Sequence, residues 1–331
     1  MKKSVWMTTA LVLLLTACSP KDSEITKGPT PVNREYPVAT STPQETKQTA
    51  NYETAPVQKQ PPVQNNPIAT PQITAKPQLG SSPKPDHVVI VVEENHSYEK
   101  IIGNKSAPFM NSLAEQGAFF TQSYANTHPS QPNYLILFSG ADQGVKDDSC
   151  GHIFKTDNLA SELLKANLTF SGYSEDLPSI GATVCTYRQY GRKHSPWVNF
   201  SNVPSKLNMP LSSFPTDDFS KLPTVSFVIP NMDNDMHDGT IQTADNWLKL
   251  HIEPYVQWAK AHNSLLILTW DEDDSSKNNH IPTIFVGSMV KAAHYDQPIT
   301  HLNVLRTIED MYNIPYTGKS ASVQPITGIW S

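Results

Sequence analysis

The sequence HVVIVVEENH at residues 87–96 gives the first indication of the fold of this chain. Its consecutive apolar, β-branched residues 88–92 are typical of a parallel strand that is buried on both faces of a sheet. In sheets of this kind ligands gather at the carboxyl ends of the strands. The polar residues 93–96 directly follow the strand, so we expect them to lie at a functional edge.

Apolar runs elsewhere in the chain predict three more strands, at residues 224–229, 264–270 and 282–286. Helical patterns separate these strands, at residues 106–117 with Gly117 as the stop, 134–138, 159–164, 244–261 with a break or kink at Pro254, and 300–312. This alternation predicts an α/β fold, a three-layer α/β/α sandwich with a mostly parallel central sheet.

The composition divides the chain near residue 86. Thirteen of the 28 prolines lie between Pro20 and Pro85, whereas all 11 histidines lie at His87 or later. With 331 residues and a formal net charge of −6, the chain has room for one or two domains and no basic footprint for nucleic acid. We therefore expect a proline-rich leader followed by one domain, residues 86–331, and no nucleic-acid partner.

The N-terminus has the pattern of an export signal. Two lysines precede an apolar run at residues 5–15, which is too short to span a bilayer and fits the core of a signal peptide. Leu15-Thr16-Ala17-Cys18 resembles the lipobox of bacterial lipoproteins, where cleavage leaves a lipidated cysteine; the alternative is an ordinary secretory signal. We expect a signal peptide over residues 1–17, lipidated Cys18, and a disordered spacer over 18–85.

Export also predicts how the remaining cysteines pair and where in the cell the protein is located. With Cys18 acylated, Cys150 and Cys185 remain as an even pair, which favours a disulfide over two free thiols in an oxidising compartment. The predicted location is a bacterial cell membrane, with the lipid anchor in the bilayer and the domain exposed outside the cytoplasm, at the cell surface or in the periplasm. We expect a monomer.

Acidic and polar residues cluster after the predicted strands. They lie at 93–96, at 230–238 (PNMDNDMHD) and at 271–274 (DEDD), and Asn279-His280 precedes the fourth strand. Carboxylates at one edge of a sheet repel each other unless a cation neutralises them, and oxygen donors with imidazoles suit a hard or borderline divalent metal. The alternative is a solvated acidic rim.

A further motif is THPSQPNYLILFSG, residues 127–140. Ser130 stands two residues before a proline and ahead of a helical apolar run, which is the position of an N-cap. Backbone N–H groups at such a helix start favour an anion, such as a phosphoryl oxygen. Taken alone, the motif favours a simple helix cap.

Together with residues 192–197 (RKHSPW), 234–238, 270–274 and 280–282, these motifs resemble the phosphoesterase family of bacterial and fungal acid phosphatases and phospholipase C enzymes. This family lies within the alkaline phosphatase-like superfamily, and the resemblance covers essentially all of residues 86–331. It implies an alkaline phosphatase-like fold and a phosphate ester as substrate.

The resemblance also implies roles for single residues. Ser130 would be the nucleophile and a metal ligand; the other implied metal ligands are Glu94, Asn95, Asp271, Glu272, Asp233, His237 and His280. The set serves one or two divalent ions, and Asp235 or Asp238 are alternatives to Asp233. His128, His237 and His280 are implied in catalysis, and His96, Lys193 and His194 in substrate binding. For His96 and His128 the alternative is hydrogen-bonded packing, and for Lys193 and His194 it is an ordinary surface position.

The function predicted on this basis is a metal-dependent phosphoesterase at the cell surface. Its favoured form is an acid phosphatase that hydrolyses phosphomonoesters through a phosphoserine intermediate. One alternative is a phospholipase C, a phosphodiesterase that acts on lipid head groups. Another, from a different class, is a non-catalytic surface lipoprotein that binds a ligand through the same fold.

Overall fold

The computed structural model describes residues 82–331 of the chain. The predictions for the signal peptide, for Cys18 and for nearly all of the spacer 18–85 therefore lie outside the described residues. Where the described part begins, the chain joins the domain directly: Tyr312 Oη donates to Pro85 O (3.1 Å), and Asp86 N donates to Asn263 O (2.7 Å). Within residues 82–331, no helix has the length and apolar character needed to cross a bilayer.

The domain is built around one eight-stranded sheet with β1 near its centre. The strand order is β11 (Ala293–Tyr295), β2 (Ala118–Phe120), β10 (Thr283–Gly287), β9 (Ser264–Trp270), β1 (His87–Glu93), β8 (Val225–Ile229), β4 (Phe170–Ser174) and β7 (Asn208–Pro210). Strand β10 is antiparallel to both of its neighbours, and the other pairs are parallel. The mostly parallel sheet predicted from the sequence is confirmed.

Smaller elements complete the described structure. Two-stranded sheets pair β3 (Ser123–Tyr124) with β12 (Ile299–Thr300) and β5 (Thr186–Tyr187) with β6 (Tyr190–Gly191). The α-helices are α1 (Tyr98–Ile101), α2 (Pro108–Gln116), α3 (Ser130–Ser139), α4 (Leu159–Lys165), α5 (Ile241–His251), α6 (Glu253–Ala259) and α7 (His301–Tyr312). Short 3₁₀ helices are η1 (Arg192–His194), η2 (Pro196–Asn199), η3 (Ser205–Leu207), η4 (Leu211–Ser213), η5 (Phe219–Lys221) and η6 (Gly318–Ser322).

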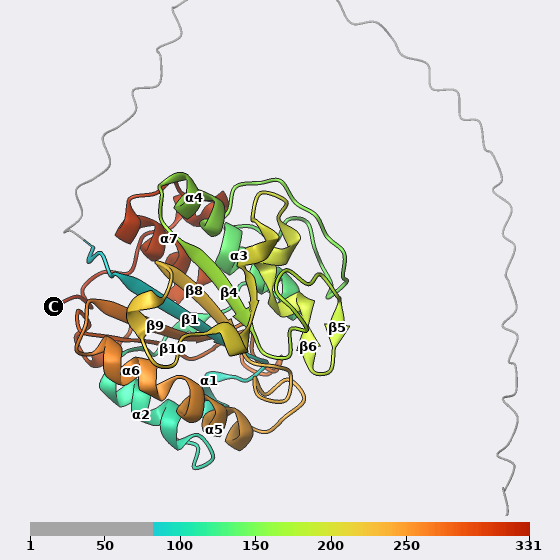
Figure 1. Ribbon diagram of the computed structural model, residues 1–331. Coiled ribbons are helices and arrows are strands. Elements are labelled where there is room, and N and C mark those ends of the chain that lie inside the picture. Colours follow the sequence, from blue (N-terminus) through green and yellow to red (C-terminus); the bar gives the residue numbers. More distant parts are fainter. Residues whose placement is uncertain (1–81) are drawn as a thin grey trace, which may run out of the picture. The chain divides into compact units, whose positions relative to one another are not determined.

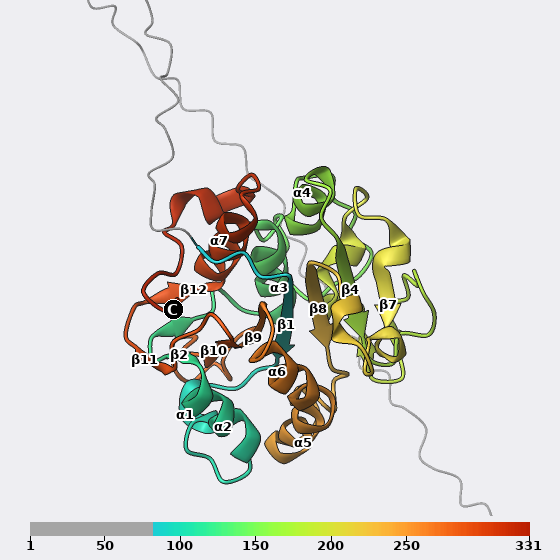
Figure 2. The ribbon, with the colours of Figure 1, turned by 60° about the vertical axis from the view of Figure 1, so that its left-hand side comes forward.

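Helices cover both faces of the sheet. Helices α3, α4 and α7 pack on the face that carries Val88, Ile90 and Val92, and α2, α5 and α6 pack on the face that carries Val89 and Val91. All five of these β1 side chains are buried, because successive side chains of a strand point to opposite faces. The three layers predicted from the alternation of elements are visible in Figures 1 and 2.

Two residues that were predicted to interrupt or end helices do so, each for a physical reason. The long helix predicted at 244–261 breaks at Ile252, and Pro254 lies in the first turn of α6, where its missing N–H costs no hydrogen bond. Gly117 ends α2 with an extended backbone (φ −129°). A Cβ there would lie 2.2 Å from Phe285 O, so glycine permits a close approach of two chain segments.

The strand register brings the three polar segments together. Ile90 of β1 pairs in parallel with Phe227 of β8 and with Ile267 of β9, so the three strands end at the same edge. Beyond the strand ends, Asp271 N donates to Glu93 O (2.9 Å) and Glu94 N donates to Asp235 O (2.8 Å). Residues far apart in the sequence thus become neighbours at this edge.

Candidate active site

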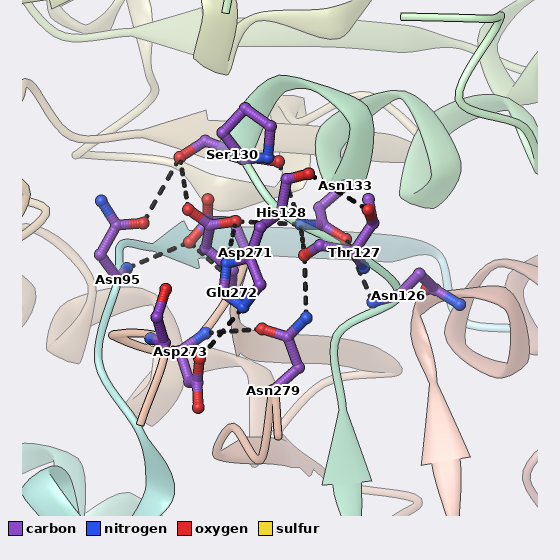
Figure 3. A network of polar contacts seen from close by, with 12 residues as sticks. Asn95, Asn126, Thr127, His128, Ser130, Asn133, Asp271, Glu272, Asp273 and Asn279 are labelled. Atoms are coloured by element: carbon purple, nitrogen blue, oxygen red, sulfur yellow. Dashed lines mark hydrogen bonds and ion pairs between the residues drawn. The ribbon is translucent and has the colours of Figure 1, made fainter. Parts of the chain in front are cut away.

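Ser130 lies at the start of α3 with its hydroxyl directed at carboxylates. Pro129 occupies the N-cap position after a cis His128–Pro129 bond, so the expectation that Ser130 itself is the N-cap is corrected. Ser130 Oγ lies 3.0 Å from Glu94 Oε2, 3.4 Å from Glu272 Oε1 and 3.4 Å from the side-chain amide of Asn95 (Figure 3). The side chain is 1% exposed. It is a buried hydroxyl with acidic neighbours, and not a helix cap.

Asp271 and Asn95 are locked to each other across two strand ends. Asp271 Oδ1 accepts from Asn95 N (3.1 Å) and from Glu272 N (2.6 Å), as Figure 3 shows. Asn95 adopts a left-handed backbone (φ 46°), which asparagine tolerates better than most residues.

Burial raises the pKa of each carboxyl in this group. The pKa of Glu94 is raised well above its ordinary value by burial and by the charges of Asp271 and Asp235. Burial raises the pKa of Asp271 to about 6, and burial with the charge of Asp271 raises the pKa of Glu272 to about 8. Without a cation, this edge of the sheet therefore holds protons near neutral pH.

The donor set around Ser130 fits a divalent cation. The Ser130 hydroxyl has one proton and can donate to only one carboxylate, yet oxygens of both Glu94 and Glu272 lie within hydrogen-bond distance. The other carboxylate oxygen therefore faces the lone pairs of the hydroxyl oxygen. Asp271 Oδ2 is buried without a hydrogen-bond partner. Carboxylate, amide and hydroxyl oxygens of this kind suit a hard metal ion. Glu94, Asn95, Ser130, Asp271 and Glu272 are brought together as the sequence predicted.

A second group shares Glu94 and adds a histidine. His194 Nε2 lies 3.1 Å from Glu94 Oε1, and His194 Nδ1 lies 3.2 Å from Asp235 Oδ2. Neither ring nitrogen makes a well-directed hydrogen bond, although the side chain is 1% exposed. Ligand atoms of Glu94, His194 and Asp235 lie within 4.8 Å of one another, the one such group among residues 82–331. Orphaned ring nitrogens between carboxylates fit a metal ligand.

Tyr134 supports this second group. Its hydroxyl donates to Glu94 Oε1, and its ring stacks on His194 with centroids 5.1 Å apart. Burial lowers the pKa of His194 well below its ordinary value, with the charges of Lys193 and His237 acting in the same direction. A neutral imidazole is the form that binds a metal.

Asp235, and not Asp233, reaches the site. Asp233 Oδ1 accepts from Gln189 Nε2 (2.9 Å), whereas it is Asp235 Oδ2 that lies 3.2 Å from His194 Nδ1. Asp235 is fully buried, and its Oδ1 accepts from His237 N (2.8 Å). We therefore revise the ligand assignment in favour of Asp235, which the sequence left as an alternative.

Lys193 and His237 form a cationic edge. Lys193 Nζ lies 3.0 Å from His237 Nε2 and 3.1 Å from Asp148 Oδ2. His237 Nδ1 lies 2.8 Å from Asp238 Oδ1, so an Nδ1–H tautomer donates to Asp238 and leaves Nε2 as acceptor for the ammonium. Burial opposes the charge on Lys193, but Glu94 and Asp148 outweigh it and raise the pKa of Lys193.

His128 lies on the opposite side of Glu272. Its Nδ1 is 2.9 Å from Glu272 Oε2, and its Nε2 is 3.3 Å from Asp273 Oδ1. Asn133 and Asn279 hold the loop that carries it, because each donates to Thr127 O (2.7 and 2.9 Å; Figure 3). His128 is 38% exposed, so it is both attached to a site carboxylate and open to solvent.

Comparison with known proteins agrees with this geometry. The model of the phosphoesterase family matches residues 104–315. The chain belongs to the phosphoesterase family. A phosphatidylinositol-3-phosphatase of Mycobacterium tuberculosis is 56% identical over 246 residues, which cover 74% of this chain and 82% of that protein. An acid phosphatase of Aspergillus fumigatus is 31% identical over 246 residues, 68% of this chain and 54% of that protein.

Solved structures support the fold. The structure of an alkaline phosphatase superfamily protein from Vibrio parahaemolyticus matches with a TM-score of 0.51 and 12% identity, covering 74% of this chain and 71% of that one. The alkaline phosphatase-like fold predicted from the sequence is confirmed. This phosphoesterase spans about half the length of the Aspergillus relative. It is an enzyme, a phosphoric monoester hydrolase, and its substrate is a phosphate ester.

Two of the histidines predicted for the phosphoesterase site stay outside the network. His280 Nδ1 lies 3.1 Å from Glu99 Oε1, His280 Nε2 lies 3.0 Å from Thr121 O, and the ring stacks on Tyr98. The ring of His96 contacts Glu94 only through its backbone oxygen (3.1 Å), and burial lowers its pKa. The structure brings neither ring into contact with Ser130, so both remain predictions without geometric support.

The sequence reading missed three residues of the site. Tyr134 and Asn133 stand four and three positions after Ser130, so the face of helix α3 that carries Ser130 also carries them; this spacing was a usable signal. Asp148 was missed because it lies in an irregular loop. Its Oδ1 accepts from Gln131 N (3.0 Å), next to Ser130, while its Oδ2 binds Lys193.

The predicted disulfide is confirmed. Cys150 and Cys185 are bonded, with an S–S distance of 2.01 Å across a sequence separation of 35 residues. The bridge lies two residues after Asp148, and Arg192, which precedes Lys193, donates from its backbone N to Cys185 O (2.9 Å). It therefore ties together the two loops that hold the cationic edge.

Proposed function

We propose that the chain is a metal-dependent phosphatase that removes the monoester phosphate from a membrane phosphoinositide, with Ser130 as nucleophile. The observation that carries the proposal is the buried Ser130 hydroxyl, 3.0 Å from Glu94 Oε2 at the start of helix α3. The substrate class follows from the Mycobacterium relative, a phosphatidylinositol-3-phosphatase 56% identical to this chain. The proposed enzyme is thus a phosphomonoesterase, as predicted from the sequence, and its substrate is a lipid.

Each step has a residue suited to it. Glu94 Oε2 takes the proton of Ser130 as the Oγ–P bond forms and the bond from phosphorus to the alkoxide breaks. The hydrogen-bonded pair of Lys193 and His237, at the partly exposed edge, gives the departing alkoxide its proton, and Lys193 also binds the non-bridging oxygens. Water then attacks the phosphoserine and gives a proton back to this pair, the P–Oγ bond breaks, and Ser130 recovers its proton from Glu94 Oε2.

The chain's own ligands define where a divalent ion would bind. Glu94, Asn95, Ser130, Asp271 and Glu272 would hold one ion. Glu94, His194 and Asp235 would hold a second. A bound ion lowers the pKa of a coordinated hydroxyl and stabilises negative charge on phosphoryl oxygens. Tyr134 and Asn133 orient Glu94 and Glu272 for this purpose by donating to their carboxylates.

The proposed location is the outer face of a bacterial membrane, with Cys18 as the lipid attachment site. The basis is the lipobox-like Leu15-Thr16-Ala17-Cys18 at the end of an apolar run. Such an anchor keeps the enzyme at a lipid surface, where a phosphoinositide is a substrate within reach. Labelling with a radioactive fatty acid tests the anchor directly: wild type is labelled, and Cys18→Ala is not.

The proposed function is tested with three substrates. We expect release of phosphate from phosphatidylinositol 3-phosphate and from p-nitrophenyl phosphate, and none of phosphocholine from phosphatidylcholine. Ser130→Ala abolishes both activities, while Ser130→Thr, which keeps a hydroxyl, retains part of them. A chelator removes the activity and a divalent metal restores it. Full activity of Ser130→Ala would refute the nucleophile, and release of phosphocholine would favour the phospholipase C alternative.

A further inference from the structure

Exposed apolar side chains gather in two short loops beside the active site. Among residues 82–331, five large hydrophobic side chains are exposed, and four of them lie in these loops: Ile153 (73%), Ile180 (55%), Val184 (40%) and Tyr187 (42%). We call these four residues the apolar rim. The fifth, Leu250 (71%), lies on α5. Single exposed apolar residues are common, whereas a group of them marks an interaction site.

The loops of the apolar rim are held in place rather than free. The Cys150–Cys185 disulfide joins them, and the guanidinium of Arg192 donates to Thr183 O (3.0 Å) in one loop and to His152 O (3.2 Å) in the other. The Arg192 side chain is buried, and this burial lowers the pKa of its guanidinium. The exposed side chains are therefore presented on a braced surface, and their exposure is not a consequence of loose loops.

The same loops lead directly into the catalytic machinery. Asp148, two residues before the disulfide, contacts Lys193 Nζ (3.1 Å) and Gln131 N (3.0 Å), next to Ser130. Gln189, two residues after Tyr187, donates to Asp233 (2.9 Å), which lies in the same turn as Asp235 and His237. Strands β5 and β6, which carry this second loop, lie at the margin of the domain in Figure 1. Whatever covers the apolar rim is thus adjacent to the phosphate-binding groups.

The charge of these loops differs from that of the rest of the domain. Residues 149–156 and 177–191 contain no Asp or Glu, and both Lys155 and Arg188 in them are exposed. The rest of the domain is acidic. The guanidinium of Arg188 lies 5.4 Å from the ring centroid of Tyr187, and its nearest acid, Asp176, is 3.8 Å away. A surface that combines apolar and aromatic side chains with neighbouring basic groups suits the interface of an anionic bilayer.

We propose that the apolar rim docks the domain onto an anionic phospholipid bilayer, so that a phosphoinositide head group enters the site without leaving the membrane. The proposal rests on the proposed function for its substrate. Insertion of Ile153, Ile180 and Tyr187 into the bilayer interface supplies apolar burial, while Lys155 and Arg188 contact lipid phosphates.

Vesicle binding tests the docking surface. The protein is the full chain with Cys18→Ala, which prevents acylation and leaves every variant with the same leader. The test variant combines Ile153→Ser, Ile180→Ser and Tyr187→Ser, and the matched control is Leu250→Ser. With sucrose-loaded vesicles of phosphatidylcholine and phosphatidylserine, we expect sedimentation to show binding about 30-fold weaker for the triple variant, and unchanged for the control. Equal binding of the triple variant and the parent would overturn the proposal.

A second readout separates docking from substrate identity. Turnover of soluble p-nitrophenyl phosphate should be the same in the parent and the triple variant, which also shows that the variant folds. Turnover of phosphatidylinositol 3-phosphate in vesicles should fall with vesicle binding. If the parent itself leaves that lipid untouched, the proposed substrate fails, but the vesicle measurement still decides the docking surface. If the triple variant does not fold, Tyr187→Ser alone is compared with Leu250→Ser.

Discussion

Metal binding should release protons, because the carboxyls that surround Ser130 hold them in the metal-free protein. With a pKa of about 8, Glu272 is mostly protonated at pH 7; with a pKa of about 6, Asp271 is mostly ionised. We expect Mn²⁺ to displace about one proton at pH 7 from this pair, since metal ligands must be deprotonated. Between pH 8 and pH 6 the apparent affinity should fall by about 100-fold, tenfold for each pH unit.

Isothermal titration calorimetry measures the displaced proton. The binding enthalpy is recorded at pH 7 in buffers with different ionisation enthalpies, and the slope gives the number of protons released. Glu272→Gln removes the group that carries the proton, so its slope should fall by about one. Asp274→Asn is the matched control, because the pKa of Asp274 is lowered to about 2, chiefly by its bonds to Lys100 and Ser276 against opposing burial. Its proton count should not change.

Two results would refute this account. A binding enthalpy independent of the buffer would show that the carboxyls are already ionised and that burial does not control them. An unchanged proton count in Glu272→Gln would place the proton elsewhere. The raised pKa values also set a sign for stability: the contribution is fully present below the ordinary carboxyl pKa and is lost as pH rises through about 6 to 8. The metal-free protein should therefore unfold at lower urea concentration at pH 8.5 than at pH 5.5.

Three further predictions follow from other contacts. Tyr134→Phe removes the hydroxyl that donates to Glu94 and should weaken metal affinity about tenfold or more, which a metal titration of activity measures; unchanged affinity contradicts it. Lys193→Met should raise the inhibition constant of inorganic phosphate about tenfold, because one charge-assisted contact is lost, and an equal constant would exclude Lys193 from phosphate binding. Burial raises the pKa of Glu309 to about 7, so wild type should lose about 2 kcal/mol of stability between pH 5 and pH 9 that Glu309→Gln retains; parallel urea curves for the two proteins would count against this.

The layered architecture was predictable because it depends on local patterns. Five β-branched residues in a row at 88–92 fit only a strand with two covered faces, and Pro254 interrupts any helix. Glu94 and Asp271 were predictable as neighbours for a related reason, whereas Ser130 was predicted from its motif and the family resemblance. Parallel strands place their carboxyl ends at one edge, so residues after strands meet there whatever their separation in sequence.

Residues outside that rule were harder to place. Asp233 and Asp235 stand two positions apart in one irregular turn, and the sequence offered no period to tell which one faces inward. His280 comes shortly before β10, but its two ring nitrogens contact Glu99 Oε1 and Thr121 O instead of the carboxylates around Ser130. Asp148 reaches Lys193 from a loop with no repeating pattern.

The fold class, the acidic cluster at the strand ends and the cysteine pair could be predicted from the sequence alone, since these follow from periodicity, strand ends and composition, whereas the role of Ser130 was predicted from a family resemblance. Only the tertiary structure decided that Asp235 and His194 meet at Glu94, that Tyr134 supports them, and that four exposed apolar side chains share one braced margin. The physical reason is that side-chain direction in loops is set by packing against distant segments. That information is spread over the whole chain and does not appear in any local pattern.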